Sequence, residues 1–282
     1  MTLDEPPHRG ERAPLVDEIA WPDGHDVCVA LTFDVDADVG VGWRRIEERL
    51  TSLSEARYGA VRGLPRILET LRRRDLRATF YVPGEVAELH PDLVRAIVAD
   101  GHEVGHHGHL HLWTDRATAS EQRQEVERGL EALDRCGVPR PRGFRSPAWE
   151  LTPATLGLLV EHGFRWDSSC MGDDRPYVES HGGMQILELP VHWSLDDWVY
   201  FGFTRDGGGV MSAPEALTRT WLLELESATA ERRMVTYTMH PECMGRGYRM
   251  RMLEQLLDEM AERGSVWFAT HAEVADLVLG AA

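Results

Sequence analysis

Short apolar runs alternate with helical patterns along most of this 282-residue chain. Such runs suit strands that are buried on both faces, as the strands of parallel sheets are. Candidate strands lie at 27–33, 78–82, 103–106, 143–145, 164–167, 186–189, 234–239 and 266–269. Helices are expected at 64–74, 92–100, 120–136, 153–162, 214–230, 250–263 and 272–279. Repeated strand–helix units with no linker rich in Ser, Gly or Pro predict a single α/β domain, a β/α barrel.

Charge and hydropathy limit the partners of this barrel. The formal net charge is -17 at pH 7, and a phosphate backbone or an anionic membrane surface requires a positive footprint. The Pro-rich, acidic residues 1–20 contain no apolar stretch of a signal peptide, and no apolar run approaches a membrane span. We therefore expect a cytoplasmic protein with no nucleic-acid or membrane partner, with an N-terminal extension over 1–25 and the barrel over 26–282.

The cysteines offer no metal or disulfide framework. They are widely separated and form no C-x-x-C pair, which favours reduced thiols. Any transition-metal site must then depend on histidines. The four positions are Cys28, Cys136, Cys170 and Cys243.

Ligand-type side chains recur where the predicted strands end. In a β/α barrel the carboxyl ends of the strands share one rim, so residues distant in sequence meet in one pocket. These residues are Asp34, Asp36, His106, His107, Arg145, Asp167 and His240.

A histidine cluster gives this rim a metal-ligand spacing. His107 and His111 lie four residues apart, and with Asp36 they would supply two imidazoles and a carboxylate. Such a set leaves a position for water, as a catalytic metal site requires. His106 and His109, three residues apart, are an alternative pair that spacing alone does not exclude.

Three further residues suit proton transfer and its support. Asp34 lies two residues before Asp36, so in a strand both point to one side, and one can bind metal while the other accepts a proton. His240 could donate a proton to a leaving amine, and Arg145 could orient Asp34. Each residue also has a structural alternative. The aspartates could simply begin a solvated loop, and His240 could be a structural hydrogen-bonding residue. Arg145 could lie in a surface turn with a packed Trp149.

Four motifs together resemble the polysaccharide deacetylase family, also called NodB-homology or carbohydrate esterase family four, over about residues 26–275. The motifs are Thr32–Asp36, His107–His111, Arg145–Trp149 and Tyr237–His240. The resemblance implies a distorted (β/α)7 barrel and a divalent metal, zinc above all, bound by Asp36, His107 and His111. It also implies Asp34 as general base, His240 as general acid and Arg145 as the residue that orients Asp34. We expect substrate contacts from Pro147, Ala148, Trp149, Asp197 and Trp198.

Departures from the common motifs indicate a branch of the family. Val35 separates the two aspartates, and Gly108 stands where Ser or Thr often follows the first metal histidine. These features look more like the intracellular branch of peptidoglycan-deacetylase-like proteins, cyclic imidases and metal-independent allantoinases. The last of these lack the second metal histidine, whereas this chain keeps His111. With the two histidines aligned in this way, His106 and His109 take supporting or structural roles.

The sequence therefore predicts a metal-dependent hydrolase of non-peptide carbon–nitrogen bonds. Its substrate would be a small molecule or an oligosaccharide, either an N-acetylated amino sugar or a small amide. A cyclic-imide or ureide hydrolase is the alternative enzyme, and a catalytically silent sugar-binding or scaffolding barrel is the alternative of another class. Related proteins suggest a homo-oligomer, with the aromatic loop 193–203 as a candidate contact.

Overall fold

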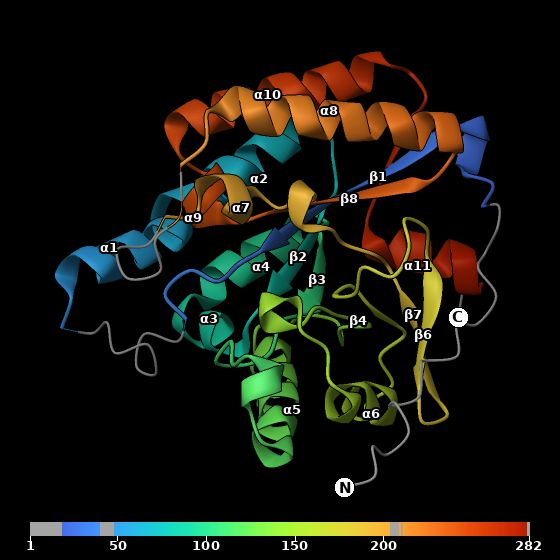
Figure 1. Ribbon diagram of the computed structural model, residues 1–282. Coiled ribbons are helices and arrows are strands. Elements are labelled where there is room, and N and C mark those ends of the chain that lie inside the picture. Colours follow the sequence, from blue (N-terminus) through green and yellow to red (C-terminus); the bar gives the residue numbers. More distant parts are fainter. Residues whose placement is uncertain (1–18, 40–47, 204–208, 210, 281–282) are drawn as a thin grey trace, which may run out of the picture.

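One curled sheet runs through the molecule (Figure 1). The computed structural model describes residues 19–39, 48–203, 209 and 211–280. Within these residues the sheet order is β6-β7-β5-β4-β3-β2-β1-β8, and β9 also pairs with β1. The strands are β1 (Val27–Asp34), β2 (Thr79–Val82), β3 (Glu103–His106), β4 (Gly143–Phe144), β5 (Trp166–Asp167), β6 (Tyr177–His181), β7 (Met184–Glu188), β8 (Met234–Met239) and β9 (Val266–Ala269).

β1 organises the sheet because all eight of its residues are buried and three strands pair with it. It pairs with β8 along most of its length, with β9 at its start and with β2 at its end. Every pairing is parallel except that of β6 with β7. In the described residues no ladder joins β7 to β8, although an isolated bridge links Asp196 to Thr238. The sheet is thus an open, distorted α/β barrel, which confirms the predicted fold class.

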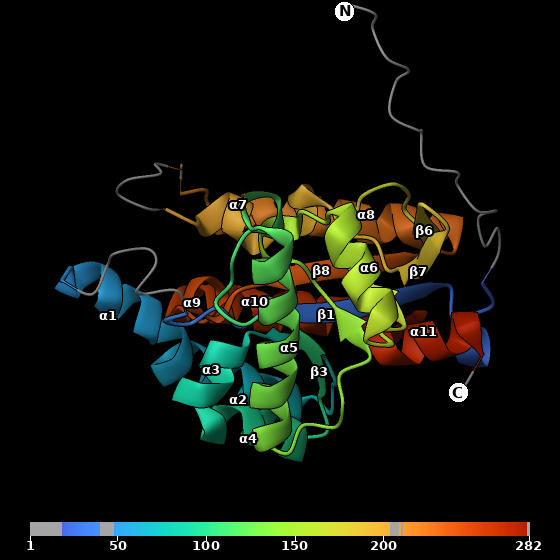
Figure 2. The same ribbon diagram turned by 90° about the horizontal axis from the view of Figure 1, so that it is seen from below.

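Helices cover the outside of this sheet. In Figure 1, α8 and α10 lie above the sheet, and Figure 2 shows α5 and α6 side by side in front of it. Trp221 of α8 stacks on Tyr237 of β8 with 4.6 Å between ring centroids, and both are fully buried. The helices are α1 (Leu50–Tyr58), α2 (Leu64–Arg73), α3 (Gly84–Leu89), α4 (Pro91–Ala99), α5 (Ala119–Arg135), α6 (Pro153–Glu161), α7 (Asp197–Phe201), α8 (Pro214–Glu231), α9 (Pro241–Met244), α10 (Gly247–Glu262) and α11 (His271–Leu279).

All eight predicted strands and all seven predicted helices are present, but the sequence missed several elements. α1 was missed because its apolar residues form no buried stripe; Leu50 is 78% exposed. β6 was missed because it forms an antiparallel hairpin with β7 through Gly182 and Gly183, outside the strand–helix repeat. α7 lies in the segment that the sequence indicated only as an aromatic loop.

The chain before β1 packs on the barrel where it is described. Ile19 and Trp21 are buried, and Trp21 lies 5.9 Å from Trp267 between ring centroids. Residues 1–18 of the predicted extension lie outside the described residues. The four cysteines are free thiols. Across the described residues, no helix combines the length and the apolar character that crossing a membrane requires.

Candidate active site

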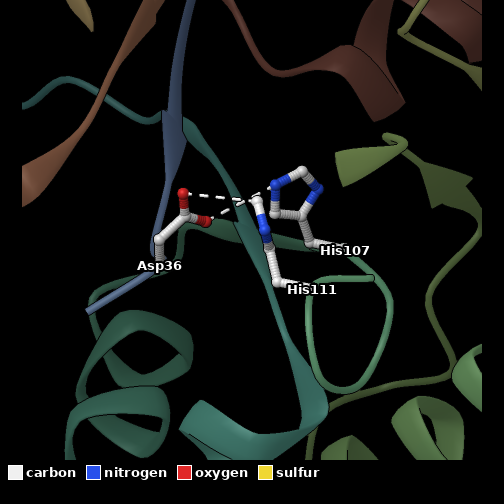
Figure 3. Close-up of side chains that lie close together, drawn as sticks. All are labelled: Asp36, His107 and His111. Carbon is white, nitrogen blue, oxygen red and sulfur yellow. Dashed lines mark ion pairs between the residues drawn. The ribbon is translucent and has the colours of Figure 1, made fainter. Parts of the chain in front are cut away.

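Asp36, His107 and His111 converge at the carboxyl ends of β1 and β3 (Figure 3). One ligand atom from each lies within 4.8 Å of the others. Asp36 Oδ1 is 3.5 Å from His107 Nε2, and Asp36 Oδ2 is 3.4 Å from His111 Nε2. Two imidazoles and a carboxylate at this spacing are a donor set that fits zinc or a similar divalent ion.

The tautomer of His107 supports this use. Its Nδ1 lies 2.7 Å from the carbonyl oxygen of Arg145, so Nδ1 carries the proton and donates it there. Nε2, which faces Asp36 at 3.5 Å, is then the ring nitrogen left to bind a metal. A backbone acceptor on the far nitrogen is the usual way in which a metal-binding histidine is oriented.

Glu125 of α5 holds the loop that carries both histidines. Its carboxylate accepts hydrogen bonds from the backbone N–H groups of His109, Leu110 and Leu112, at 2.9, 2.9 and 3.2 Å. Gly108 fits beside it in a left-handed conformation (φ 73°), and a Cβ there would lie 2.9 Å from Glu125 Oε2. The glycine that departs from the common motif therefore leaves room for the carboxylate that supports the loop.

The alternative pair, His106 and His109, does not form the site. His106 Nε2 lies 3.0 Å from the carbonyl of Val126, and its Nδ1 accepts the N–H of Gly108 at 3.1 Å. Burial lowers the pKa of His106 to about 3, so this ring is neutral and has both nitrogens occupied. His109 packs against Gly84, where a Cβ would lie 2.4 Å from its Nδ1.

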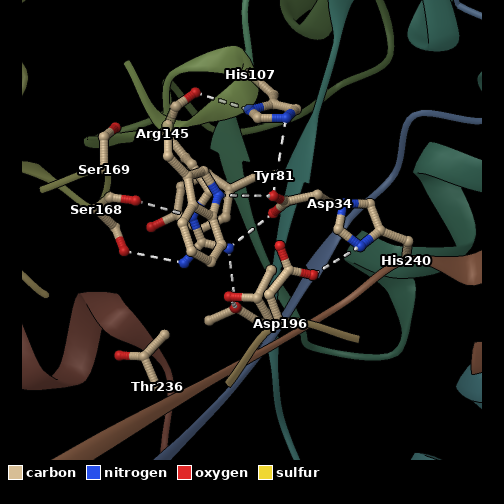
Figure 4. Close-up of polar contacts among 12 residues, drawn as sticks. Asp34, Tyr81, His107, Arg145, Ser168, Ser169, Asp196, Thr236 and His240 are labelled. Carbon is tan, nitrogen blue, oxygen red and sulfur yellow. Dashed lines mark hydrogen bonds and ion pairs between the residues drawn. The ribbon is translucent and has the colours of Figure 1, made fainter. Parts of the chain in front are cut away.

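Asp34 lies beside the group of Asp36, His107 and His111, and two donors hold its carboxylate (Figure 4). Arg145 Nη1 donates to Asp34 Oδ1 at 2.7 Å, and Trp149 Nε1 reaches Oδ2 at 3.4 Å. Burial alone would raise the pKa of Asp34, but the positive charge of Arg145 and the nearby His107 and His240 lower it overall. Asp38 lies two residues after Asp36 in the sequence, but its carboxylate bonds His90 Nε2 at 2.7 Å instead of joining this group.

Arg145 is fully buried and fixed on every side. Its Nε and Nη2 donate to the carbonyl and the hydroxyl of Ser168, both at 2.9 Å. Its guanidinium carbon lies 4.3 Å from the ring centroid of Tyr81. The guanidinium therefore presents Nη1 to Asp34 from a rigid frame.

His240 is held by two carboxylates. Asp197 Oδ1 lies 2.8 Å from His240 Nδ1 and also accepts the backbone N–H of His240 at 3.0 Å. Asp196 Oδ1 lies 3.5 Å from the same Nδ1. Burial opposes a charged imidazole, yet Asp196 and Asp197 raise the pKa of His240 well above its ordinary value. Asp197, expected as a substrate contact, is 0% exposed and supports His240 instead.

The other expected substrate contacts lie in two places, a short turn after β4 and the start of α7. Pro147, Ala148 and Trp149 make a short turn in which Ala148 and Trp149 have positive φ (56° and 57°). Trp149 stacks on Trp193 at 4.5 Å, and Trp198 lies 5.4 Å from His240 between ring centroids. Strained backbone beside a reactive group is typical of functional sites.

Several supporting residues were missed from the sequence. Ser168 is an ordinary polar residue after a strand, and only the fold shows that it binds Arg145. Glu125 carried a usable signal, because it lies on the buried face of α5 together with Val126 and Gly129. A buried carboxylate at such a position requires donors, and the backbone N–H groups of the histidine loop supply them.

Two imidazoles and a carboxylate at the rim of an open α/β barrel, with a second carboxylate beside them, are an arrangement suited to hydrolysis. Residues 22–166 match the polysaccharide deacetylase family, and the chain belongs to that family. The peptidoglycan deacetylase of Helicobacter pylori is 25% identical over 279 residues, covering 88% of this chain and 95% of that protein. A solved structure from Mycobacterium smegmatis, assigned to the polysaccharide deacetylases, is 35% identical with a TM-score of 0.89, covering 96% of this chain and 95% of that one.

An allantoinase structure shares the fold, with a TM-score of 0.81 at 20% identity and coverage of 93% of this chain and 94% of that one. These relatives define the chain as a hydrolase of carbon–nitrogen bonds other than peptide bonds. A pseudoenzyme of carbohydrate esterase family four from Bacillus anthracis shares the fold as well, with a TM-score of 0.58 at 17% identity and coverage of 89% of this chain and 66% of that one, so the fold alone does not decide against a catalytically silent barrel.

Proposed function

We propose that this protein is a metal-dependent deacetylase that removes an acetyl group from the nitrogen of an amino sugar or hydrolyses a similar small amide. The observation that carries the proposal is that Asp36, His107 and His111 meet within 4.8 Å while Asp34 and His240 lie beside them. Zinc is the metal that we propose, since two imidazoles and one carboxylate are its usual catalytic ligands.

Asp36, His107 and His111 would hold the ion. When bound, the ion supplies Lewis-acid polarisation of the amide carbonyl and lowers the pKa of water. The orientation of His107 by the Arg145 carbonyl prepares its Nε2 for this role.

Asp34 would accept the proton of the attacking water. Its two oxygens are oriented by Arg145 and Trp149, and it stands 3.9 Å from His107 Nε2, next to the proposed ligands. A general base requires this closeness to the nucleophile. Arg145 thus positions Asp34 and does not itself touch the reacting atoms.

His240 would donate a proton to the departing nitrogen. Asp197 takes its Nδ1–H, so the proton on Nε2 is the one available for transfer. Asp196 adds a second negative charge near Nδ1, which favours the protonated ring. Trp193 is 44% exposed and stacks on the buried Trp149, so its outer face is one on which a sugar ring or a planar imide can pack.

The test is a substrate panel of chitooligosaccharides, muropeptides, cyclic imides and allantoin, with purified enzyme before and after chelation. We expect acetate release from the N-acetylated sugars, its loss on chelation and its return with zinc. A protein without stoichiometric metal whose activity resists chelator would contradict the metal mechanism. Turnover of imides or allantoin alone would favour the alternative enzyme.

The cytoplasmic location, the homo-oligomer and the intracellular branch stay predictions.

A further inference from the structure

Asp167 and Glu188 form a buried carboxyl pair beneath the candidate active site. Asp167 ends β5 and Glu188 ends β7, and the two are direct partners in the parallel ladder. Both side chains are 0% exposed. Two ionised carboxylates on adjacent strands would repel each other at close range, and burial increases that cost.

The hydrogen bonds around the pair occupy one oxygen of each carboxyl. The N–H groups of Ser169 and Cys170 donate to Glu188 Oε1 at 2.8 and 2.9 Å. Ser169 Oγ donates to Asp167 Oδ1 at 3.0 Å. The remaining oxygens, Asp167 Oδ2 and Glu188 Oε2, are buried and accept no bond from any donor among the described residues. One oxygen of each carboxyl lies within 4.8 Å of one oxygen of the other.

We propose that Asp167 Oδ2 and Glu188 Oε2 share one proton, and that this pair is a positioning device for the candidate active site. The shared proton gives both remaining oxygens a partner and removes one of the two negative charges. Burial raises the pKa of both carboxyls, which favours the retention of a proton by the pair.

The pair reaches the site through the turn that follows β5. Ser168 binds two nitrogens of Arg145 (Figure 4). Ser169 Oγ accepts the N–H of Ser146 at 2.8 Å. Arg145 in turn binds Asp34 at 2.7 Å. The carboxyl pair therefore fixes the turn that holds the guanidinium, and its effect on catalysis rests on the proposed function of Asp34.

A bound metal is the competing explanation for this cluster. Cys170 offers Sγ, and one ligand atom from each of the three residues lies within 4.8 Å of the others. To bind a metal, Cys170 would have to release its proton, and burial raises the pKa of this thiol in the metal-free protein. A shared proton needs no third ligand and no deprotonated sulfur.

Amide variants distinguish the two explanations. In Glu188→Gln the amide N–H can replace the shared proton while the amide oxygen keeps both backbone bonds, and Asp167→Asn can do the same from the other side. In the double variant the two amide NH2 groups would point at each other. If one amide rotates to avoid this contact, it loses its bond to Ser169. We expect each single variant to lower Tm by less than about 2 °C, and the double to lower it by about 2–6 °C beyond the sum of the singles.

Two further readouts separate positioning from general stability. Infrared spectra should show carbonyl bands of protonated carboxyls in the wild type, and each single variant should lose the component that belongs to this pair. With an N-acetylated chitooligosaccharide, the double variant should lose about tenfold or more in kcat with KM within about twofold, because displacement of Arg145 affects the base and not substrate binding. Glu103→Gln is the control: among the described residues this buried carboxylate of β3 binds Thr79 and Ala272 but neither Arg145 nor the turn after β5, and its variant should keep kcat.

Two results would overturn the proposal. In the first, each single variant lowers Tm as much as the double variant does, and mass spectrometry shows that the variants have lost a second equivalent of bound metal. The other is a wild-type spectrum without a protonated-carboxyl component that the single variants lose. If the wild type hydrolyses no member of the panel, the proposed function fails, while the melting and infrared measurements still decide whether the proton is shared.

Discussion

Two clusters at the rim contain the same residue types, yet their geometry suits different chemistry. Asp36, His107 and His111 form one, and Asp196, Asp197 and His240 form the other; in each, one ligand atom per residue lies within 4.8 Å of the others. In the first cluster a backbone carbonyl takes the far nitrogen of His107, which leaves Nε2 for the shared centre. In the second, both carboxylates face the single Nδ1 of His240.

The difference shows that composition alone does not identify a metal site. Two imidazoles around one carboxylate offer neutral nitrogens and one charge, which a divalent ion requires. Two carboxylates around one imidazole stabilise a proton on that ring instead. We therefore expect the first cluster to bind metal and the second to donate a proton.

Removal of a ligand from the first cluster should have the largest effect. His111→Ala should lose bound zinc and lower kcat/KM by about 10³-fold or more, because the ligand set becomes incomplete. His240→Ala is the matched variant in the second cluster and should keep its zinc while kcat falls. Metal content by mass spectrometry and kcat with an N-acetylated sugar test both. Zinc lost equally from the two variants would show that the clusters are not distinct.

Asp34→Asn should separate metal binding from proton transfer. The amide keeps the shape and can still bond with Trp149 or Arg145, but it cannot accept the proton of water, so kcat should fall by about 10²–10⁴-fold. Zinc content should equal that of the wild type. An Asp34→Asn enzyme that turns over at the wild-type rate would show that another residue is the base.

Much of this comparison could be predicted from the sequence. Strand-end positions and residue types indicated Asp36, the histidine cluster and His240 as candidates, because parallel strands bring their carboxyl ends together. The resemblance to the deacetylase family then selected His107 and His111 as the ligands. Spacing did not separate the two histidine pairs; the backbone partners of His106 did. The fold class followed from alternation alone.

The supporting contacts could not be predicted because they join segments far apart in the chain. Asp197 was expected to face substrate, and nothing in its sequence neighbourhood shows that it lies under His240, 43 residues away. The pairing of Asp167 with Glu188 depends on β6 and β7 forming a hairpin that the strand–helix repeat does not predict. Side-chain partners of this kind are set by register, which the pattern of apolar residues leaves open.

Asp197→Asn should change the second cluster without changing the first. Loss of the charge bonded to Nδ1 destabilises the protonated ring, so the pKa of His240 falls and the alkaline limb of the kcat profile moves to lower pH by about one unit or more. The limb moves to lower pH because His240 must be protonated to act as the acid. With a lower pKa, it loses that proton at a lower pH. An alkaline limb that stays in place would exclude His240 as the group that limits activity at high pH.

Asp196→Asn should produce the smallest shift in the same direction. Asp196 lies 3.5 Å from Nδ1, compared with 2.8 Å for Asp197, so it acts on the ring through charge alone. Its second role, accepting the N–H of Trp198 at the start of α7, is one that asparagine performs about as well, so Tm should change little. We expect the alkaline limb to move by about half the shift seen in Asp197→Asn, with zinc content unchanged. A larger shift than that of Asp197→Asn would mean that Asp196 is the principal partner of His240, and the ranking of the two carboxylates would be reversed.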